Sequence, residues 1–96
     1  MKVCFTGDAW FTGDAWADYR HWADTNPAML AKVNLLIEDA RRRMFTGLGK
    51  PEPLRGSLAG WWSRRITGDH RLVYRIEGKP GADQRIEVAT CRFHYE

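Results

Sequence analysis

The segment from Asn26 to Arg43 constrains the fold of this chain more than any other. An asparagine followed by a proline is typical of a helix N-cap and its first helical position. Apolar residues then recur at helical spacing and mark one buried face: Met29, Leu30, Val33, Leu36, Ile37 and Ala40. The sequence therefore predicts a helix that starts at Pro27 and ends in the triplet Arg41, Arg42 and Arg43, where cations are favourable.

A shorter helix is predicted just before this one. Trp16, Tyr19 and Trp22 step by three residues, so they lie on one stripe of a helix. Thr12 or Asp14 would cap its N-terminus, because both side chains can accept hydrogen bonds from the backbone N–H groups of a first helical turn.

A perfect tandem repeat overlaps the start of this helix, since residues 5–10 and 11–16 both read FTGDAW. We interpret it as a local duplication. If the helix extended backward, Trp10 would lie about 240° from the last tryptophan of the apolar stripe. We therefore assign Phe5 to a first strand, MKVCF. Residues 6–12 are then predicted to form a surplus loop or a helical extension that exposes Trp10.

The second half of the chain is predicted to form most of the sheet. Residues 45–60 are rich in glycine and proline and are expected to form a loop. Two helices followed by adjacent strands predict one α+β domain over residues 1–96, with a mainly antiparallel sheet. A tight turn at Thr67–Asp69 would join the first two of the three strands that follow the loop: residues 61–66, 70–77 and 85–93.

The net charge of +3 conceals a strongly basic central block. Residues 41–75 hold nine basic and two acidic side chains, whereas residues 1–40 hold three basic and six acidic ones. The arginines of this block alternate with apolar residues, as in a strand that presents one face to a core and the other to a ligand. A polyanion such as RNA suits that face. A solvated surface is the alternative.

Other features limit the class of protein. No apolar run approaches the roughly 20 residues of a membrane span, and the N-terminus shows no signal peptide, so we expect a cytoplasmic protein without membrane association. Cys4 and Cys91 lie far apart, and two buried thiols are favoured over a disulfide. The three histidines show no metal-ligand spacing, and no cofactor is predicted.

An anion site is predicted between two neighbouring strands. If the turn spans Thr67–Asp69, Arg65 lies directly opposite Arg71, and like charges in that position destabilise a sheet unless an anion binds between them. A two-residue turn would shift the register and remove this argument. Glu52 lies between two prolines that stiffen the backbone and would serve as a base among cations. His94, at the chain end, is the side chain best suited to proton transfer near neutral pH.

These groups suit the cleavage of RNA without a metal ion. A base removes the 2′-hydroxyl proton, cations stabilise the phosphorane, and an acid protonates the leaving 5′-oxygen. Glu52 and His94 would be the base and the acid, and Tyr95 would orient the phosphate or stack on a base. Taken singly, each has an ordinary alternative: a salt bridge for Glu52, a surface position for His94 and packing for Tyr95.

Five short segments of the sequence resemble motifs of the YoeB/Txe toxins of the RelE superfamily. They are KPEPL in the loop, GWWSRRI and HRLVY in the strands, CRFHY near the end and AWADYRHW near the start. The resemblance covers nearly the whole chain. It implies a fold like that of microbial ribonucleases, in which a small twisted sheet has two helices on one face.

The resemblance also implies roles for individual residues. Glu52 matches the general base, Arg71 the arginine that stabilises the scissile phosphate, His94 the general acid, and Tyr95 the tyrosine beside it. Lys50 and Arg65 match supporting cations. The remaining candidates for substrate binding are arginines of the basic block: Arg41, Arg42, Arg43 and Arg64. For the helix-terminal triplet, helix capping explains the charges as well as contact with an RNA backbone does.

The function implied is that of a toxin in a type II toxin–antitoxin pair, which cuts messenger RNA in the A site of the 70S ribosome. Its partner would be a YefM/Phd-like antitoxin, whose acidic disordered segment competes with RNA for the basic surface. A homodimer of the toxin would be a further assembly. The alternatives are a non-catalytic RNA- or antitoxin-binding module that acts as co-repressor of its own operon, and a ribonuclease that needs no ribosome.

Two features depart from the family pattern. Glu96 follows the tyrosine at which the family tail normally stops, and it adds a negative charge near an anionic substrate. The duplicated hexapeptide lies where the first strand meets the first helix, away from the proposed chemistry, and is expected to be tolerated.

Overall fold

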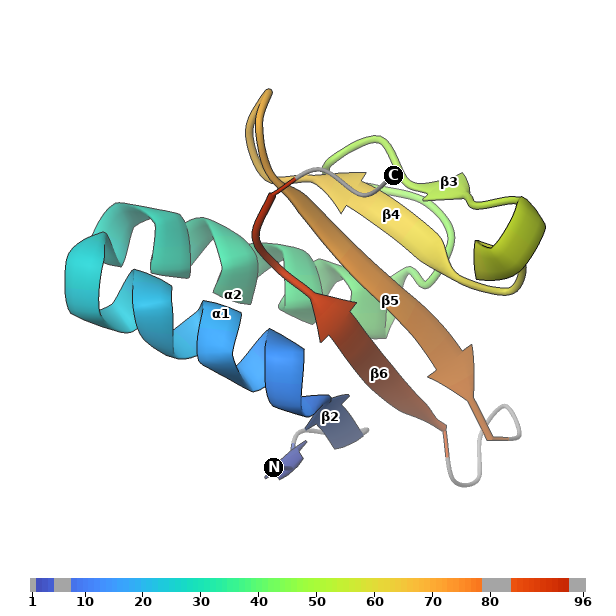
Figure 1. Cartoon of the computed structure of the whole chain (residues 1–96). Coiled ribbons are helices and arrows are strands. Elements are labelled where there is room, and N and C mark those ends of the chain that lie inside the picture. Colours follow the sequence, from blue (N-terminus) through green and yellow to red (C-terminus); the bar gives the residue numbers. More distant parts are fainter. Residues whose placement is uncertain (1, 5–7, 79–83, 94–96) are drawn as a thin grey trace.

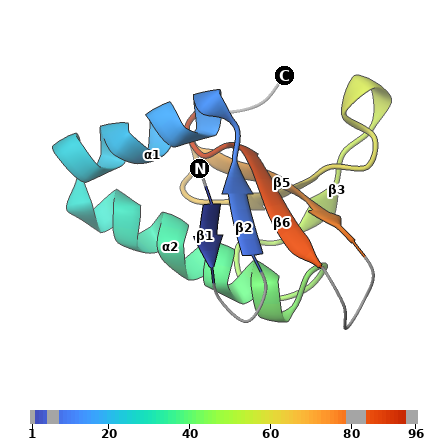
Figure 2. The ribbon, with the colours of Figure 1, turned by 90° about the horizontal axis from the view of Figure 1, so that it is seen from below.

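A computed structural model describes residues 2–4, 8–78 and 84–93 of the chain. The two helices, α1 (Gly13–Thr25) and α2 (Pro27–Arg42), lie beside each other and cover one face of a twisted sheet (Figure 1). The view from below shows both helices on the same side of the strands (Figure 2). Neither described helix combines the length and the apolar character that a membrane crossing requires.

The described residues form a sheet of six strands in the spatial order β1-β2-β6-β5-β4-β3. Only β2 and β6 run parallel in this part of the chain; each of the other neighbouring pairs is antiparallel. The predicted α+β fold with a mainly antiparallel sheet is confirmed. The strands are β1 (Lys2–Cys4), β2 (Asp8–Phe11), β3 (Glu52–Pro53), β4 (Trp62–Arg65), β5 (Arg71–Glu77) and β6 (Arg85–Thr90).

Both helices begin where the sequence predicts. The Asn26 side chain accepts a hydrogen bond from the Met29 N–H at 3.2 Å, and Pro27 is the first residue of α2. Thr12, one of the two predicted caps of α1, accepts from the Ala15 N–H at 3.1 Å. These side chains satisfy backbone donors that a helix N-terminus leaves without partners.

The core lies between the helices and the inner face of the sheet. The apolar stripe of α2 is buried as predicted, except that Leu30 is half-buried, and Trp22 anchors α1. Cys91 is buried with a free thiol, as expected, and its burial, aided by the nearby Asp18 carboxylate, raises the pKa of the Cys91 thiol to about 12. The buried cluster consists of Ala9, Phe11, Ala15, Trp22, Met29, Val33, Leu36, Ile37, Ala40, Ile66, Leu72, Tyr74, Ile86, Val88 and Cys91.

The tandem repeat folds differently from the prediction. Asp8–Phe11 was expected within a surplus loop or a helical extension, but it forms β2 and pairs with β6, while Lys2–Cys4 forms an added edge strand. The buried Phe11 directly precedes the Thr12 cap, so this copy joins strand to helix without an intervening loop. Trp10 alternates to the other face and is 39% exposed. Phe5 lies outside the described residues.

The predicted loop at residues 45–60 also contains regular structure. Its segment Glu52–Pro53 is β3, and Gly56–Leu58 forms a short 3₁₀ helix, η1. A proline can occupy this strand because β3 lies at the edge of the sheet, where an N–H donor is not needed on the solvent side. The Leu54 N–H donates to the Trp61 carbonyl at 2.9 Å and closes the segment onto the start of β4.

Candidate active site

The register of three strands brings candidate residues to one face of the sheet. On β4 the Arg64 side chain reaches Asp39 of α2, so alternation directs Arg65 to the opposite face, which we call the outer face. Arg65 pairs directly with Arg71 of β5, as the three-residue turn predicts. Glu52 pairs with Ser63, two residues from Arg65, and therefore shares the outer face.

This register sets the separation of the groups. Directly opposed residues have Cβ atoms roughly 4.5–5.5 Å apart, and diagonal neighbours are about 7–8 Å apart. Arg65 and Arg71 are opposed, and Glu52 is diagonal to Arg65. The register thus places one acidic and two basic residues at neighbouring positions on the outer face.

Lys50 joins this group through the loop that leads into β3. The Arg65 N–H donates to the Gly49 carbonyl at 2.7 Å, which fixes the backbone next to Lys50 against the end of β4. Lys50, Glu52 and Arg65 are exposed, and Arg71 is half-buried. The outer face therefore carries Glu52, Arg65 and Arg71, and the backbone of the loop at Lys50 lies next to it.

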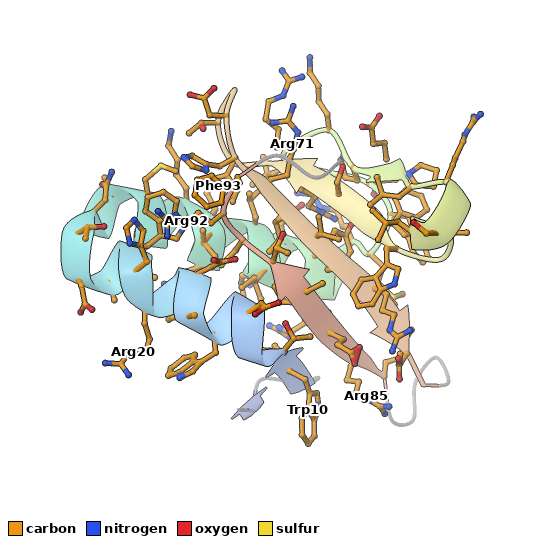
Figure 3. The ribbon with its side chains drawn as sticks, in the orientation of Figure 1. Trp10, Arg20, Arg71, Arg85, Arg92 and Phe93 are labelled. Atoms are coloured by element: carbon orange, nitrogen blue, oxygen red, sulfur yellow. The ribbon has the colours of Figure 1, made fainter. Side chains whose placement is uncertain are left out.

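Arg71 holds the turn and the chain end together. Its guanidinium Nη1 donates to the carbonyls of Thr67 at 2.8 Å and His70 at 3.2 Å. Its backbone N–H donates to the Phe93 carbonyl at 3.0 Å. Arg71 and Phe93 lie at the same end of the sheet (Figure 3). The segment that leads to His94 is thus anchored at the residue expected to contact the phosphate.

His94 and Tyr95 themselves lie outside the described residues. Their predicted roles therefore stay predictions.

Backbone strain borders both predicted proton-transfer residues. Within the described residues, the non-glycine residues with positive φ are Lys50, at 51°, and Phe93, at 63°. Lys50 is two residues before Glu52, and Phe93 immediately precedes His94. Such conformations cost roughly 1–3 kcal/mol, persist only where the surroundings fix them, and cluster at active sites.

Arg64 corrects one prediction. We expected it to bind substrate, but its side chain is fully buried and forms an ion pair with Asp39 at 2.6 Å. It also donates to the Tyr74 hydroxyl at 3.0 Å and to the Thr46 and Leu48 carbonyls at 2.9 and 3.1 Å. The alternation of β4 explains the error, because adjacent arginines on a strand face opposite sides.

Asp39 is the carboxylate that balances this buried arginine. Burial alone would favour its neutral form, but hydrogen bonds from Arg43, the Leu48 N–H and Arg64 outweigh that effect and lower the pKa of Asp39 to about 2. The ion pair ties α2 to β4. Arg64 therefore lies on the helix side of the sheet, opposite the outer face, and does not face a ligand.

The helix-terminal arginines differ from one another in the same way. Arg41 pairs with Glu38 and is largely covered, and Arg43 pairs with Asp39. Arg42 has a side chain that is 70% exposed and approaches Glu38 only at 4.0 Å. Of the triplet, Arg42 is the residue whose charge is most available to a polyanion.

No role is predicted for His70 from the sequence, although this residue belongs to the HRLVY motif. Its ring accepts a hydrogen bond from the Phe93 N–H at 2.8 Å and packs against Trp22. The motif identifies this segment of the sequence, but only the fold shows that Nδ1 of His70 contacts Phe93. Among the residues that the structure describes, no three His, Cys, Asp or Glu side chains gather closely enough to hold a metal ion.

Comparisons with known proteins match nearly the whole chain. Residues 11–95 match the model of a family described as the YoeB-like toxin of bacterial type II toxin–antitoxin systems. The chain is 48% identical over 95 residues to the toxin YoeB of Escherichia coli strain K12, which covers 99% of this chain and 100% of the relative.

Solved structures resemble the fold closely. A YoeB/ParE toxin from Agrobacterium tumefaciens superposes with a TM-score of 0.88 at 54% identity, covering 91% of this chain and 98% of that one. A heterotetrameric YoeB–YefM toxin–antitoxin complex from Staphylococcus aureus gives 0.82 at 34% identity, covering 93% and 98%. A YoeB dimer from the same organism gives 0.80 at 36% identity, covering 91% and 95%.

Proposed function

The chain belongs to the YoeB-like toxin family of bacterial type II toxin–antitoxin systems, and on that premise we propose that it is an endoribonuclease that cleaves messenger RNA in the A site of the 70S ribosome. The observation that carries the proposal is the shared outer face of Glu52, Arg65 and Arg71. A base and cations close to the scissile phosphate are what cleavage through the 2′-hydroxyl requires.

Each group has a defined task in this proposal. Glu52 removes the proton from the 2′-hydroxyl, whose oxygen attacks the adjacent phosphorus. Arg65, Arg71 and Lys50 stabilise the charge that builds on the phosphorane. His94 donates a proton to the departing 5′-oxygen, and Tyr95 orients the phosphate. The products are a 2′,3′-cyclic phosphate and a free 5′-hydroxyl, and no metal or other cofactor takes part.

We further propose that a YefM/Phd-like antitoxin neutralises the toxin in the cytoplasm. The complex of a YoeB toxin with YefM in S. aureus supports such a partner, and the YoeB dimer supports a homodimer as a further assembly. An acidic, disordered antitoxin segment would be attracted to the Lys50, Arg65 and Arg71 cluster and would compete there with RNA.

A cleavage assay on programmed ribosomes in the presence of EDTA tests the enzymatic proposal. Glu52→Gln and His94→Gln should each lower the rate by roughly 10²–10⁴-fold, as loss of a general acid or base does. Glu87→Gln is the matched control, because Glu87 is also on the outer face but pairs with Arg75 of β5. Undiminished cutting by both test variants would refute the mechanism.

Expression without an antitoxin supplies a second readout. The parent should arrest growth, whereas Glu52→Gln should not. Binding to ribosomes without cleavage would favour the non-catalytic co-repressor, and efficient cleavage of free RNA would favour a general ribonuclease.

A further inference from the structure

We propose that His70 is a positioning residue for the proposed reaction: it fixes the backbone of Phe93, the residue that immediately precedes the proposed general acid His94 in the sequence. The inference rests on the proposed function and adds a residue to its site. His70 need not touch RNA in this role. It acts through the backbone of Phe93.

Both polar backbone groups of Phe93 are held by two consecutive residues. The Phe93 N–H donates to Nδ1 of His70 at 2.8 Å, and the Phe93 carbonyl accepts from the Arg71 N–H at 3.0 Å. Phe93 has a φ of 63°, a conformation that side-chain-bearing residues rarely adopt. The two hydrogen bonds fix the orientation of the Phe93 backbone.

The His70 ring is itself held in place. It packs edge-to-face on Trp22, with ring centroids 4.9 Å apart, and it also contacts the Phe93 ring at 5.9 Å. The His70 carbonyl accepts from the Ile66 N–H at 3.0 Å and the Thr67 N–H at 3.3 Å. A ring fixed by the turn and by α1 can in turn hold the Phe93 N–H in one position.

The residues just before Phe93 are anchored to α1 as well. The Trp22 indole N–H donates to the Cys91 carbonyl at 2.8 Å, and the Cys91 N–H donates to Asp18 at 3.2 Å. The Arg92 guanidinium lies 4.4 Å from the Phe93 ring centroid. Trp22 therefore supports both His70 and the segment that His70 holds.

Two consecutive residues connect Phe93 to the proposed anion site. His70 and Arg71 are adjacent; the first fixes the N–H side of Phe93, and the second fixes the carbonyl side and carries the guanidinium on the outer face. An acceptor at Nδ1 requires that this nitrogen carry no proton, so neutral His70 must hold its proton on Nε2. The backbone of Phe93 is thereby fixed relative to Arg71, the arginine proposed to bind the phosphate.

The test compares His70→Asn with His70→Leu in the full-length protein. An asparagine oxygen can occupy nearly the position of Nδ1 and accept the Phe93 N–H, whereas leucine has similar bulk and no acceptor. His21→Leu is the matched control, because His21 also packs edge-to-face on Trp22, at 5.0 Å, from within α1. The readouts are kcat and KM on programmed ribosomes and hydrogen exchange of the Phe93 amide by NMR.

We expect His70→Leu to lower kcat by about 10²-fold, the loss that a misplacement of about 1 Å can cause, with little change in KM. Its Phe93 amide should lose protection from exchange. His70→Asn should recover most of kcat and of the protection, and His21→Leu should match the parent. Parental kcat in His70→Leu, or equal losses in His70→Asn and His70→Leu, would overturn the inference.

A measurement on the parent alone remains decisive if a variant does not fold. Long-range ¹H–¹⁵N spectra should show the proton of His70 on Nε2, and the Phe93 amide should be protected. A proton on Nδ1 or a rapidly exchanging Phe93 amide would overturn the proposal. Failure of the parent to cut programmed ribosomes would instead refute the proposed function, which separates the two outcomes.

Discussion

Two adjacent arginines of β4 have opposite roles. Arg64 is fully buried and pairs with Asp39, whereas Arg65 is exposed on the outer face opposite Arg71. The difference follows from the two-residue period of a strand and not from any difference between the side chains. Sequence alone identified both as cations, but only their position relative to α2 shows which one can meet a ligand.

Substitution of each arginine by methionine distinguishes the buried position from the exposed one. Arg64→Met should lower the free energy of unfolding by about 3–5 kcal/mol, because it leaves buried carbonyls and the Asp39 carboxylate without their partner. Arg65→Met, the matched control, should change it by no more than about 0.5 kcal/mol yet strongly reduce RNA cleavage. Urea unfolding and the ribosome assay measure the two effects. Equal stabilities of the two variants would show that the buried network contributes little.

At the scale of elements, the Arg64–Asp39 pair joins α2 and β4 to the loop between them. Arg64 donates to carbonyls of Thr46 and Leu48, and Asp39 accepts from the Leu48 N–H at 2.9 Å. This network fixes the loop before it reaches Lys50 and Glu52. A stable support behind the outer face allows the proposed catalytic groups to be held on an exposed edge.

Acid should weaken this connection in a defined range. The pKa of Asp39 is about 2 in the folded protein and close to 4 when unfolded, so its stabilisation is complete above about pH 4 and is lost as the pH falls through 2. Linkage puts that contribution at about 2 kcal/mol. Unfolding free energies measured from pH 5 to 2 should therefore fall less steeply in Asp39→Asn.

Glu38→Gln is the control for this prediction. Glu38 pairs with Arg41, and its side chain is about a third exposed, so water screens the pair. The slope of stability with pH should change much less than in Asp39→Asn. Identical slopes in the parent and Asp39→Asn would contradict the assignment.

The tandem repeat is the element that the sequence could not resolve. Phe5 and Phe11 are each followed by Thr-Gly-Asp-Ala-Trp, so the local sequence is identical at both junctions. Helix phase correctly excluded Trp10 from the apolar stripe of α1. It could not show that residues 8–11 would displace Lys2–Cys4 from β6, because that choice depends on pairing with a distant strand.

Deletion of residues 5–10 tests this account of the repeat. It joins Cys4 to Phe11 and puts Val3 in the register position of Ala9, opposite Ile86. The shortened chain should fold, lose the added edge strand and cleave RNA at a rate comparable with the parent. NMR contacts between Val3 and Ile86 would report the new pairing. An unfolded or inactive product would show that the duplicated strand is required.

At the scale of the whole molecule, the sequence predicted the fold class, both helix starts and the Arg65–Arg71 pairing. Local signals carried these predictions: an Asn-Pro cap, helical spacing and a three-residue turn. The burial of Arg64 and the contact between His70 and Phe93 could not be predicted, because each depends on contacts between elements far apart in the chain. His70 meets Phe93 across 23 positions of sequence.

The two faces of the sheet carry different kinds of residues. The inner face holds the core and the buried ion pair, and the outer face carries the exposed cations and Glu52. At the other end of the sheet, Trp10 and Arg85 lie away from Arg71 and Phe93 (Figure 3). The added strand therefore enlarges the sheet at a distance from the proposed chemistry.

The central claim is that this outer face cuts RNA by means of the 2′-hydroxyl of the message itself. The most direct measurement programs ribosomes with a message that carries a single 2′-deoxynucleotide immediately 5′ of the scissile phosphate, with the all-ribose message as control. We predict that the control yields a 2′,3′-cyclic phosphate and a 5′-hydroxyl end and that the deoxy message stays intact at that position. Cleavage of the deoxy message there, or 5′-phosphate ends on the products, would contradict the account.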